Sequence, residues 1–282
     1  MTLTTRFAPS PTGLLHLGHA YAACFAYRLA QKHSGRFLLR IEDVDTTRSK
    51  PHWEQQIYDD LTWLGLSWET PVMRQSDRTA AYDAAFHSLA ERGLVYPCSC
   101  SRADIKSALS APQEGDVHHG PDGVIYPGTC RGRRLQEAQH TDALRLNMEE
   151  AIKHLPTSLR FREHGENPAQ HDIECAALPA DVGDIVLRRR ISVEIAYHLA
   201  VVVDDAAQKV TYVTRGSDLF DATKIHVTLA TLLGLPIPHY HHHRLVRDEN
   251  GKRLAKRDDA RSLKSLREQG NLPQDIFDML KI

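Results

Sequence analysis

Three residues near the N-terminus, His16, Gly18 and His19, have side chains suited to phosphate chemistry. They follow a strand expected over residues 4–8 and a turn-rich passage with two prolines, and they begin a helix expected from about residue 16. Helix N-terminal N–H groups attract anions, glycine permits close approach, and imidazoles donate hydrogen bonds to phosphate oxygens. The pattern predicts a nucleotide site, although histidines that only cap a surface helix give the same short motif.

The C-terminal tail is rich in cations and imidazoles. GKRLAKRDDA, over residues 251–260, contains Lys256, whose ammonium on a flexible stem can follow phosphates into a transition state. Taken alone, such a basic run is more typical of a solvated surface. For His239 and the run 241–243 we expect exposed or phosphate-contacting side chains in preference to a metal cluster.

Three cysteines have the spacing of a metal site. Cys98 and Cys100 form a Cys-x-Cys pair, and Cys130 follows after a long loop. Zinc prefers four tetrahedral ligands, mainly thiolate and imidazole. On that ground the default fourth ligands are histidines: His118, His119 and His140. Buried free thiols are the alternative, and Cys24 and Cys175, which lack partners at metal spacing, are expected in the core.

The elements that must position these groups are those of an α/β protein. Strands are expected over residues 4–8 and 36–41, with helices from about residue 16, from Ser49 as the capping residue, and from Asp77 to Gly93. Strands and helices that alternate at these lengths favour a parallel sheet with crossover helices.

The composition of the chain changes twice. Residues 96–185 are rich in Cys, Gly, Pro and short polar stretches, so we expect an inserted subdomain that splits one α/β domain into 1–95 and 186–236. EIAYHLAVVVDD and KVTYVTRG, in the second half, are expected as strands. Residues 237–282 are expected to be mainly helix and loop.

The composition limits which classes of protein this chain can belong to. The 282 residues, 41% hydrophobic, fill one sizeable core or two modest ones. No apolar run is long enough for a leader or a membrane span, and five cysteines, an odd number, favour a reducing compartment, so we expect a cytoplasmic protein. Lys and Arg (35) balance Asp and Glu (36), so any nucleic-acid contact requires a local basic patch. A monomer is the default expectation.

Four segments resemble, in order, the motifs of class I aminoacyl-tRNA synthetases of the glutamyl and glutaminyl type. RFAPSPTGLLHLGHAYAA, which begins at Arg6, resembles the first nucleotide-binding signature, and RIEDVDTTRS over residues 40–49 resembles the next segment. Tyr197 and Thr-Arg215-Gly-Ser-Asp218 resemble the substrate-pocket tyrosine and the Arg-Gly-x-Asp element. The run 251–260 resembles the loop usually written Lys-Met-Ser-Lys-Ser. The resemblance implies a Rossmann-type catalytic domain that uses ATP with Mg²⁺.

The resemblance implies L-glutamate as the substrate, and the residue types agree. A guanidinium binds a carboxylate with two hydrogen bonds, so Arg6 and Arg215 can hold the carboxylates of glutamate. Glu42 can accept from the ammonium, and the Ser10 and Tyr197 hydroxyls can add hydrogen bonds. An ordinary ion pair is the alternative for Glu42 and Arg215.

The resemblance also implies the residues that act on ATP. The expected catalytic groups are His16, His19 and Lys256, and formation of the adenylate needs positioned cations and no protein nucleophile. The expected ATP-binding residues are His16, Gly18, His19, Arg253, Leu254, Ala255, Lys256 and Arg257. One departure is that Ala255 stands where the family usually has serine and Arg253 where a first lysine is common.

Short relatives called glutamyl-Q tRNA(Asp) synthetases have Cys-x-Cys followed by Tyr-x-x-x-Cys, which matches Cys98, Cys100, Tyr126 and Cys130. By this resemblance Tyr126 is the fourth ligand of one structural Zn²⁺, with His118 or His119 as the weaker alternative.

The chain stops soon after the lysine-rich loop, where full-length glutamyl enzymes continue into an anticodon-binding domain, so we expect no such domain here. The short relatives are understood to activate glutamate without tRNA and to transfer it to the queuosine at the wobble position of tRNA(Asp), which becomes the expected partner. Two alternatives remain open: a truncated synthetase that charges a tRNA 3′ end, and a non-catalytic zinc-bearing RNA-binding protein.

Overall fold

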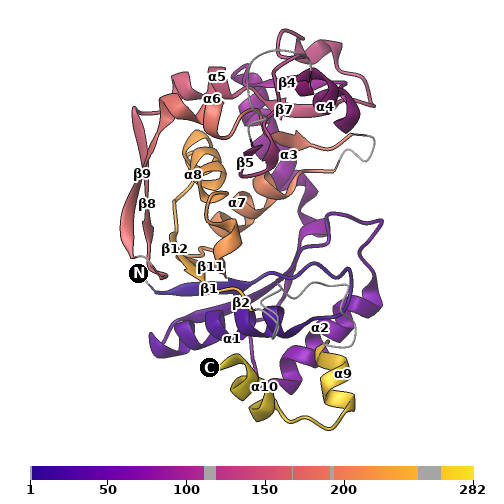
Figure 1. Cartoon of the computed structure of the whole chain (residues 1–282), viewed down its shortest axis with the longest axis vertical. Helices are drawn as coiled ribbons and strands as arrows, with labels where there is room; N and C mark the ends of the chain where they lie inside the picture. The colour runs from indigo at the N-terminus through magenta and orange to yellow at the C-terminus, as the bar shows by residue number, and fades with distance from the viewer. Residues whose placement is uncertain (1, 111–118, 167, 191–193, 247–261) are drawn as a thin grey trace.

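The computed structural model describes residues 2–110, 119–166, 168–190, 194–246 and 262–282. Figure 1 shows strands β1, β2, β11 and β12 at mid-height, helices α1, α2, α9 and α10 below them, and the segment with α4, α5 and α6 at the opposite end. None of the helices in these ranges is long and apolar enough to cross a membrane.

The first half of the central sheet is parallel. β1 (Thr4–Phe7), β2 (Arg36–Ile41) and β3 (Met73–Arg74) lie in the order β1-β2-β3, with Arg6 opposite Leu38. The strands of residues 4–8 and 36–41 are therefore confirmed. Nearly every residue of β1 and β2 is buried, because helices cover both faces of such a sheet.

The second half of the sheet joins segments far apart in sequence. Its order is β11-β12-β8-β9, formed by β11 (Tyr212–Gly216), β12 (His239–His243), β8 (Ser158–Glu163) and β9 (Ala169–Glu174). β11, β12 and β8 run parallel, and β9 pairs with β8 as an antiparallel hairpin. The Thr211 N–H donates to the Thr4 carbonyl at 3.0 Å, which places β11 beside β1. The result is a Rossmann-like arrangement with β1 and β11 at its centre.

Helices cover the sheet in two apolar clusters. α1 (Leu17–Lys32) and α2 (Pro51–Trp63) share one cluster with the C-terminal helices α9 (Leu263–Glu268) and α10 (Pro273–Leu280). The other cluster contains α3 (Thr79–Glu91), α7 (Tyr197–Ala207) and α8 (Thr223–Leu232). Tyr82, Phe86 and Leu89 point into it, as expected.

The part of the chain around the cysteines forms a smaller antiparallel sheet. Its order is β10-β7-β4, from β10 (Val186–Arg188), β7 (Ala143–Leu146) and β4 (Val95–Cys98). The other elements here are α4 (Arg102–Ser110), β5 (His119–Gly120), β6 (Gly123–Val124), α5 (Met148–Ala151) and α6 (Leu178–Asp181). Short 3₁₀ turns occur at Gln75–Arg78, Leu135–Glu137, Ile152–His154, Cys175–Ala177 and Ser217–Leu219.

Two local expectations are wrong. The run HLAVVVDD belongs to helix α7, because an apolar run this short fits a buried helix as well as a strand, and α7 is buried on nearly all sides. Lys50, and not Ser49, is the N-cap of α2, and the Ser49 hydroxyl has no hydrogen-bond partner within the described ranges. The tail contains the expected helices, α9 and α10, and a short strand, β12, precedes them.

Candidate active site

His16 and His19 form the N-terminal cap of α1. The His16 Nδ1 atom accepts from the Gly18 N–H at 3.0 Å, and the His19 Nδ1 atom accepts from the His16 N–H at 3.2 Å. The two rings lie 3.9 Å apart. A Cβ at Gly18 would come within 2.9 Å of the His16 ring, so this turn requires glycine. Since both Nδ1 atoms accept, the proton of each neutral ring is on Nε2.

The chain before and after the lysine-rich loop contacts α1. Arg253, Leu254, Ala255, Lys256 and Arg257 lie outside the described residues. Ser262, which follows them, forms a β-bridge with His16, and the Leu263 N–H donates to the Leu15 carbonyl at 2.8 Å. Arg244, which precedes the loop in the chain, lies over the ring of Tyr21 in α1, with its Cζ atom 4.6 Å from the ring centre.

A buried ion cluster joins β1, β2 and α7. Asp205 accepts from Arg6 at 3.0 and 3.3 Å and from Arg40 at 2.7 Å. Arg40, which is fully buried, also donates to Glu42 at 3.2 Å, and Arg6 donates to the Thr214 carbonyl at 3.2 Å. Each guanidinium is thereby held by its neighbours, as charged groups in a dry interior require.

Glu42, Tyr197 and Arg215 surround this cluster. Burial raises the pKa of Glu42, and Arg40 and Arg6 offset only part of that rise. Burial also raises the pKa of Tyr197, helped by Glu42 and opposed by Arg215 and Arg6. These mutual effects mean that four predicted residues, Arg6, Glu42, Tyr197 and Arg215, share one low-dielectric region.

Ser10 lies beside Glu42 through backbone contacts. The Pro9 carbonyl accepts from the Glu42 N–H at 3.0 Å, and the Thr12 N–H donates to the Ser10 carbonyl at 2.8 Å. The turn after β1 thus brings the fifth predicted residue to the end of β2.

Arg215 has a different set of partners. It donates to His242 at 3.0 Å, to His226 at 2.7 Å and to Thr223 at 2.8 Å. His242 and His243 are 4% and 6% exposed, so of the two alternatives for the β12 histidines, exposed or phosphate-contacting, exposure is wrong for these two. Their burial follows from the place of β12 between β11 and β8 in the sheet.

Four residues of this region were not among the predicted site residues: Arg40, Asp205, His226 and His242. Two had a signal in the sequence. Arg40 is a cation within the apolar run RFLLRI, and Asp205 is the last residue of HLAVVVDD, directly after an apolar run. A charge inside such a run indicates a buried partner. The sequence contained no such signal for the two histidines. Only the pairing of β11 with β12 brings His242 to Arg215.

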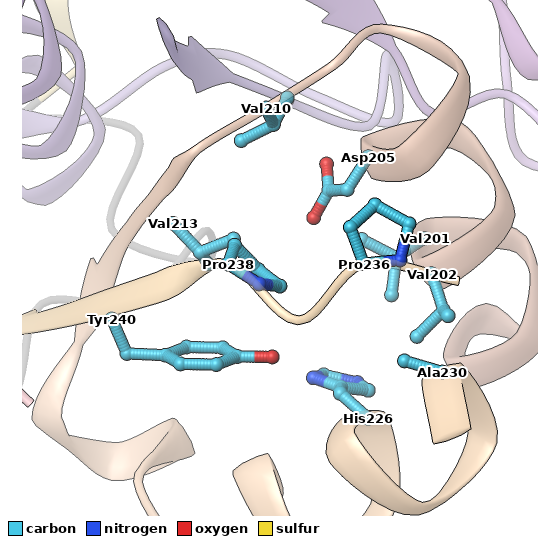
Figure 2. A pocket seen from close by; sticks show the side chains of 10 residues that line it. All are labelled: Val201, Val202, Asp205, Val210, Val213, His226, Ala230, Pro236, Pro238 and Tyr240. Carbon is cyan, nitrogen blue, oxygen red and sulfur yellow. The ribbon is translucent and has the colours of Figure 1, made fainter. Parts of the chain in front are cut away.

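A small cavity lies next to Asp205 of the ion cluster (Figure 2). Valines and prolines form most of its wall, and its polar members are Asp205, His226 and Tyr240, whose hydroxyl points toward His226. Burial raises the pKa of Tyr240 to about 12, although Arg215 opposes the rise, so this hydroxyl stays protonated.

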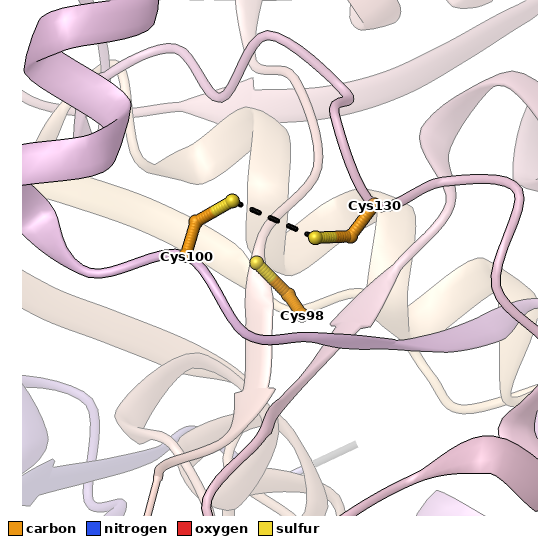
Figure 3. Close-up of side chains that lie close together, drawn as sticks. All are labelled: Cys98, Cys100 and Cys130. Carbon is orange, nitrogen blue, oxygen red and sulfur yellow. Dashed lines mark hydrogen bonds between the residues drawn. The ribbon is translucent and has the colours of Figure 1, made fainter.

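The three predicted cysteines converge between β4 and the loop that follows β6 (Figure 3). The sulfurs of Cys98, Cys100 and Cys130 lie within 4.8 Å of one another, and those of Cys100 and Cys130 are 3.5 Å apart. Tetrahedral thiolates around zinc stand about 3.8 Å apart for Zn–S bonds of about 2.3 Å, so the donor set fits that metal. The Tyr126 hydroxyl lies 3.4 Å from the Cys100 sulfur.

The pKa shifts of the thiols have opposite directions, since burial raises the pKa of Cys100. Burial raises the pKa of Cys130, but hydrogen bonds from Tyr126 and from the Ser99 backbone outweigh burial and lower it to about 6. Burial and the neighbouring thiols raise the pKa of Tyr126. Among the described residues the candidate metal cluster contains three cysteines and no histidine.

A wide groove connects the two sites. Its lining includes Cys100 and Tyr126 of the cysteine cluster and Tyr197 and His198 of α7. Much of its polar lining is basic: Arg48, Arg102, Lys106, Arg145, Arg189 and Arg190. Asp184, one of two carboxylates in the described part of its lining, is already paired with Arg131 at 2.8 Å. The groove therefore has a positive surface beside Tyr197.

The fold and these motifs match a known family, described as tRNA synthetases class I (E and Q), catalytic domain, over residues 2–282. The chain belongs to this family, whose members are ligases. A glutamyl-Q tRNA(Asp) synthetase of Rhodobacter capsulatus is 56% identical over 280 residues, which cover 97% of this chain and 98% of that protein.

Two solved structures show the same architecture. Glutamate-tRNA synthetase from Elizabethkingia anophelis superposes with a TM-score of 0.72 at 26% identity over 92% of this chain. A glutamate tRNA ligase from Elizabethkingia meningosepticum, in complex with its amino acid, gives a TM-score of 0.70 at 26% identity, also over 92% of this chain. The chain spans about half the length of these two proteins, 53% and 52%.

The ion cluster predicts a large loss of stability for Asp205→Asn. Two buried guanidinium groups then lose their shared carboxylate, and the free energy of unfolding in urea should fall by about 3 to 5 kcal/mol. Asp172→Asn is the matched control, because its pair with Arg160 is 48% and 61% exposed and contributes about 1 kcal/mol or less. Equal losses in the two variants would contradict the role of Asp205.

Proposed function

We propose that this protein activates L-glutamate with ATP, without tRNA, and forms glutamyl-adenylate. The observation that carries the proposal is the convergence of Arg6, Glu42, Tyr197 and Arg215, from four separate segments, on one buried region. Two guanidinium groups suit the two carboxylates of glutamate, and Glu42 suits its ammonium. A bound ammonium would also favour the ionised form of Glu42, against the burial that raises its pKa.

The nucleotide is expected at the start of α1. The Nδ1 atoms of His16 and His19 accept hydrogen bonds from backbone N–H groups at this turn. Each ring therefore has its N–H at Nε2, which we assign as the donor to a phosphate oxygen. An oxygen of the substrate carboxylate attacks the α-phosphorus of ATP, the bond to the bridging oxygen breaks, and pyrophosphate leaves with its Mg²⁺. Lys256, with the flanking residues 253–257, is assigned to the charge that develops on the phosphates.

For the second step we propose transfer of glutamate from the adenylate to queuosine at the wobble position of tRNA(Asp). A hydroxyl of the cyclopentenediol attacks the acyl carbon, and AMP leaves. The name of the relative that is 56% identical supports this acceptor. The basic groove beside Tyr197 supports it physically, because phosphates bind where cations line a concave surface.

A structural Zn²⁺ held by Cys98, Cys100, Cys130 and Tyr126 is part of the proposal. The fit of the sulfur spacing supports it. Cys100 and Tyr126 belong both to the proposed zinc site and to the lining of the basic groove. The ion would therefore fix the segment that forms this wall of the groove.

Activation is tested by glutamate-dependent exchange of pyrophosphate into ATP in the absence of tRNA. We expect exchange, and we expect Lys256→Ala to lower its rate at least about a hundredfold while zinc content stays unchanged, because charge stabilisation at phosphates has effects of this size. Lys264→Ala, an exposed lysine on α9, is the control. No exchange in the wild-type protein would leave the non-catalytic RNA-binding alternative.

The acceptor is tested with labelled glutamate and tRNA(Asp) that has or lacks queuosine. We expect label only on the tRNA that carries queuosine, and we expect periodate treatment of its diol to prevent labelling. Label that does not depend on queuosine would favour the alternative of a synthetase that charges the 3′ end.

Zinc is tested by metal analysis of the purified protein. We expect about one Zn²⁺ per chain, and we expect Cys100→Ser to remove most of it. Cys175→Ala is the control, because this buried cysteine lies in the main core away from the cluster. Equal zinc content in the two variants would show that the thiol cluster does not bind the metal.

A further inference from the structure

Arg215 is a buried cation whose hydrogen-bond partners among the described residues are all neutral. Its three acceptors are His242 Nε2, His226 Nδ1 and the Thr223 hydroxyl, and it lies over the Tyr240 ring at 5.2 Å. No ion pair joins it to a carboxylate within the described ranges of the chain. Arg6 and Arg40, by contrast, share Asp205.

A guanidinium only donates hydrogen bonds, so Arg215 determines the tautomers of its neighbours. His242 must accept at Nε2, so its proton is on Nδ1 and is donated to Glu163 Oε2 at 2.5 Å. His226 must accept at Nδ1, so its Nε2–H is donated to His198 Nδ1 at 3.0 Å. One cation thus orders a chain of hydrogen bonds in two directions.

Glu163 is fixed just as firmly. Its Oε1 atom accepts from the backbone N–H groups of His242 at 2.9 Å and Gly165 at 2.6 Å. A Cβ at position 165 would lie 2.2 Å from the His242 carbonyl, so glycine is required for this approach. The carboxylate therefore has one oxygen for the backbone and one for the His242 ring.

The charge states agree with this chain of hydrogen bonds. Burial lowers the pKa of His226 and of His242, so both rings are neutral. Burial raises the pKa of Glu163, but hydrogen bonds from the His242 ring and backbone outweigh it and lower the pKa to about 2, so this group is ionised.

We propose that His226, His242 and Glu163 are positioning residues for Arg215. The two neutral histidines accept its hydrogen bonds, and Glu163 orients His242, so a carboxylate of the substrate is the counter-ion of Arg215. This inference rests on the proposed function and deepens it. Among the described residues, protein contacts use three of the five N–H groups of Arg215, and the other two are assigned to the ligand. A neutral amide in the same place leaves a buried cation uncompensated, so the arrangement selects glutamate against glutamine.

The substitution Glu163→Gln separates this role from simple packing. The backbone N–H groups require an oxygen at the Oε1 position, so the amide NH₂ must face His242 Nδ1. His242 then carries its proton on Nε2, where it meets the Nε–H of Arg215, donor against donor. Glu174→Gln, an exposed glutamate on the adjacent strand β9, is the matched control.

We expect Glu163→Gln to raise the KM for glutamate about tenfold in pyrophosphate exchange and to leave the KM for ATP unchanged. Inhibition by glutamine should change much less, so the discrimination falls. The Glu174→Gln variant should match the wild type. A folded Glu163→Gln protein with unchanged glutamate KM, or with equal changes for glutamate and glutamine, would overturn the proposal.

A second pair of variants tests the other side of Arg215. His226→Asn keeps an acceptor near the Nδ1 position and should retain most of the discrimination, whereas His226→Leu should lose it. Equal discrimination in the two variants would overturn the role of His226.

The tautomers themselves are measurable without any activity. In ¹⁵N NMR spectra of the wild-type protein, His242 should carry its proton on Nδ1, and in Glu163→Gln on Nε2. A wild-type His242 protonated on Nε2 would overturn the positioning role, whereas a lack of exchange activity with the expected tautomer would overturn only the proposed function.

Discussion

The carboxylate of Asp205, shared between Arg6 and Arg40, is the interaction on which the rest of the site depends. It joins β1 and β2, near the N-terminus, to α7, which is 165 to 199 residues further along the chain. In a dry interior an unpaired guanidinium is very unfavourable, so the two halves of the sheet must meet with Asp205 between the arginines. A salt bridge of this kind does more to select one arrangement of α7 than to add stability.

The position of α7 has direct consequences at both of its ends. Its last turn supplies Asp204, which accepts from Tyr82 at 2.8 Å and Gln75 at 2.9 Å and so ties α7 to α3 and the turn before it. Its first residue is Tyr197, which faces Glu42 and the basic groove. A helix fixed by buried charges at one end thus presents its other end to the basic groove.

The three buried arginines of this region have distinct roles because their partners differ. Arg40 and Arg6 share Asp205, and Glu42 also pairs with Arg40, so both guanidinium groups have carboxylate partners within the protein. Arg215 is held by neutral groups and keeps its positive charge. Arg6 and Arg215 are both proposed to bind glutamate, and the neighbouring acceptors decide how much of each positive charge the protein itself compensates.

The sequence by itself determined the parallel α/β class, the helix that follows the turn at His16, and the cysteine cluster, because these depend on local patterns and short motifs. Its motifs also singled out Arg6, Glu42, Tyr197 and Arg215, which the fold brings into one buried region. It did not determine the helical state of HLAVVVDD, because a short apolar run lacks a period that separates helix from strand. Only the tertiary structure placed Glu163 and His242 behind Arg215, through the pairing of β8, β12 and β11. Contacts between strands so distant in sequence leave no local pattern, since they arise from the order of strands in the sheet.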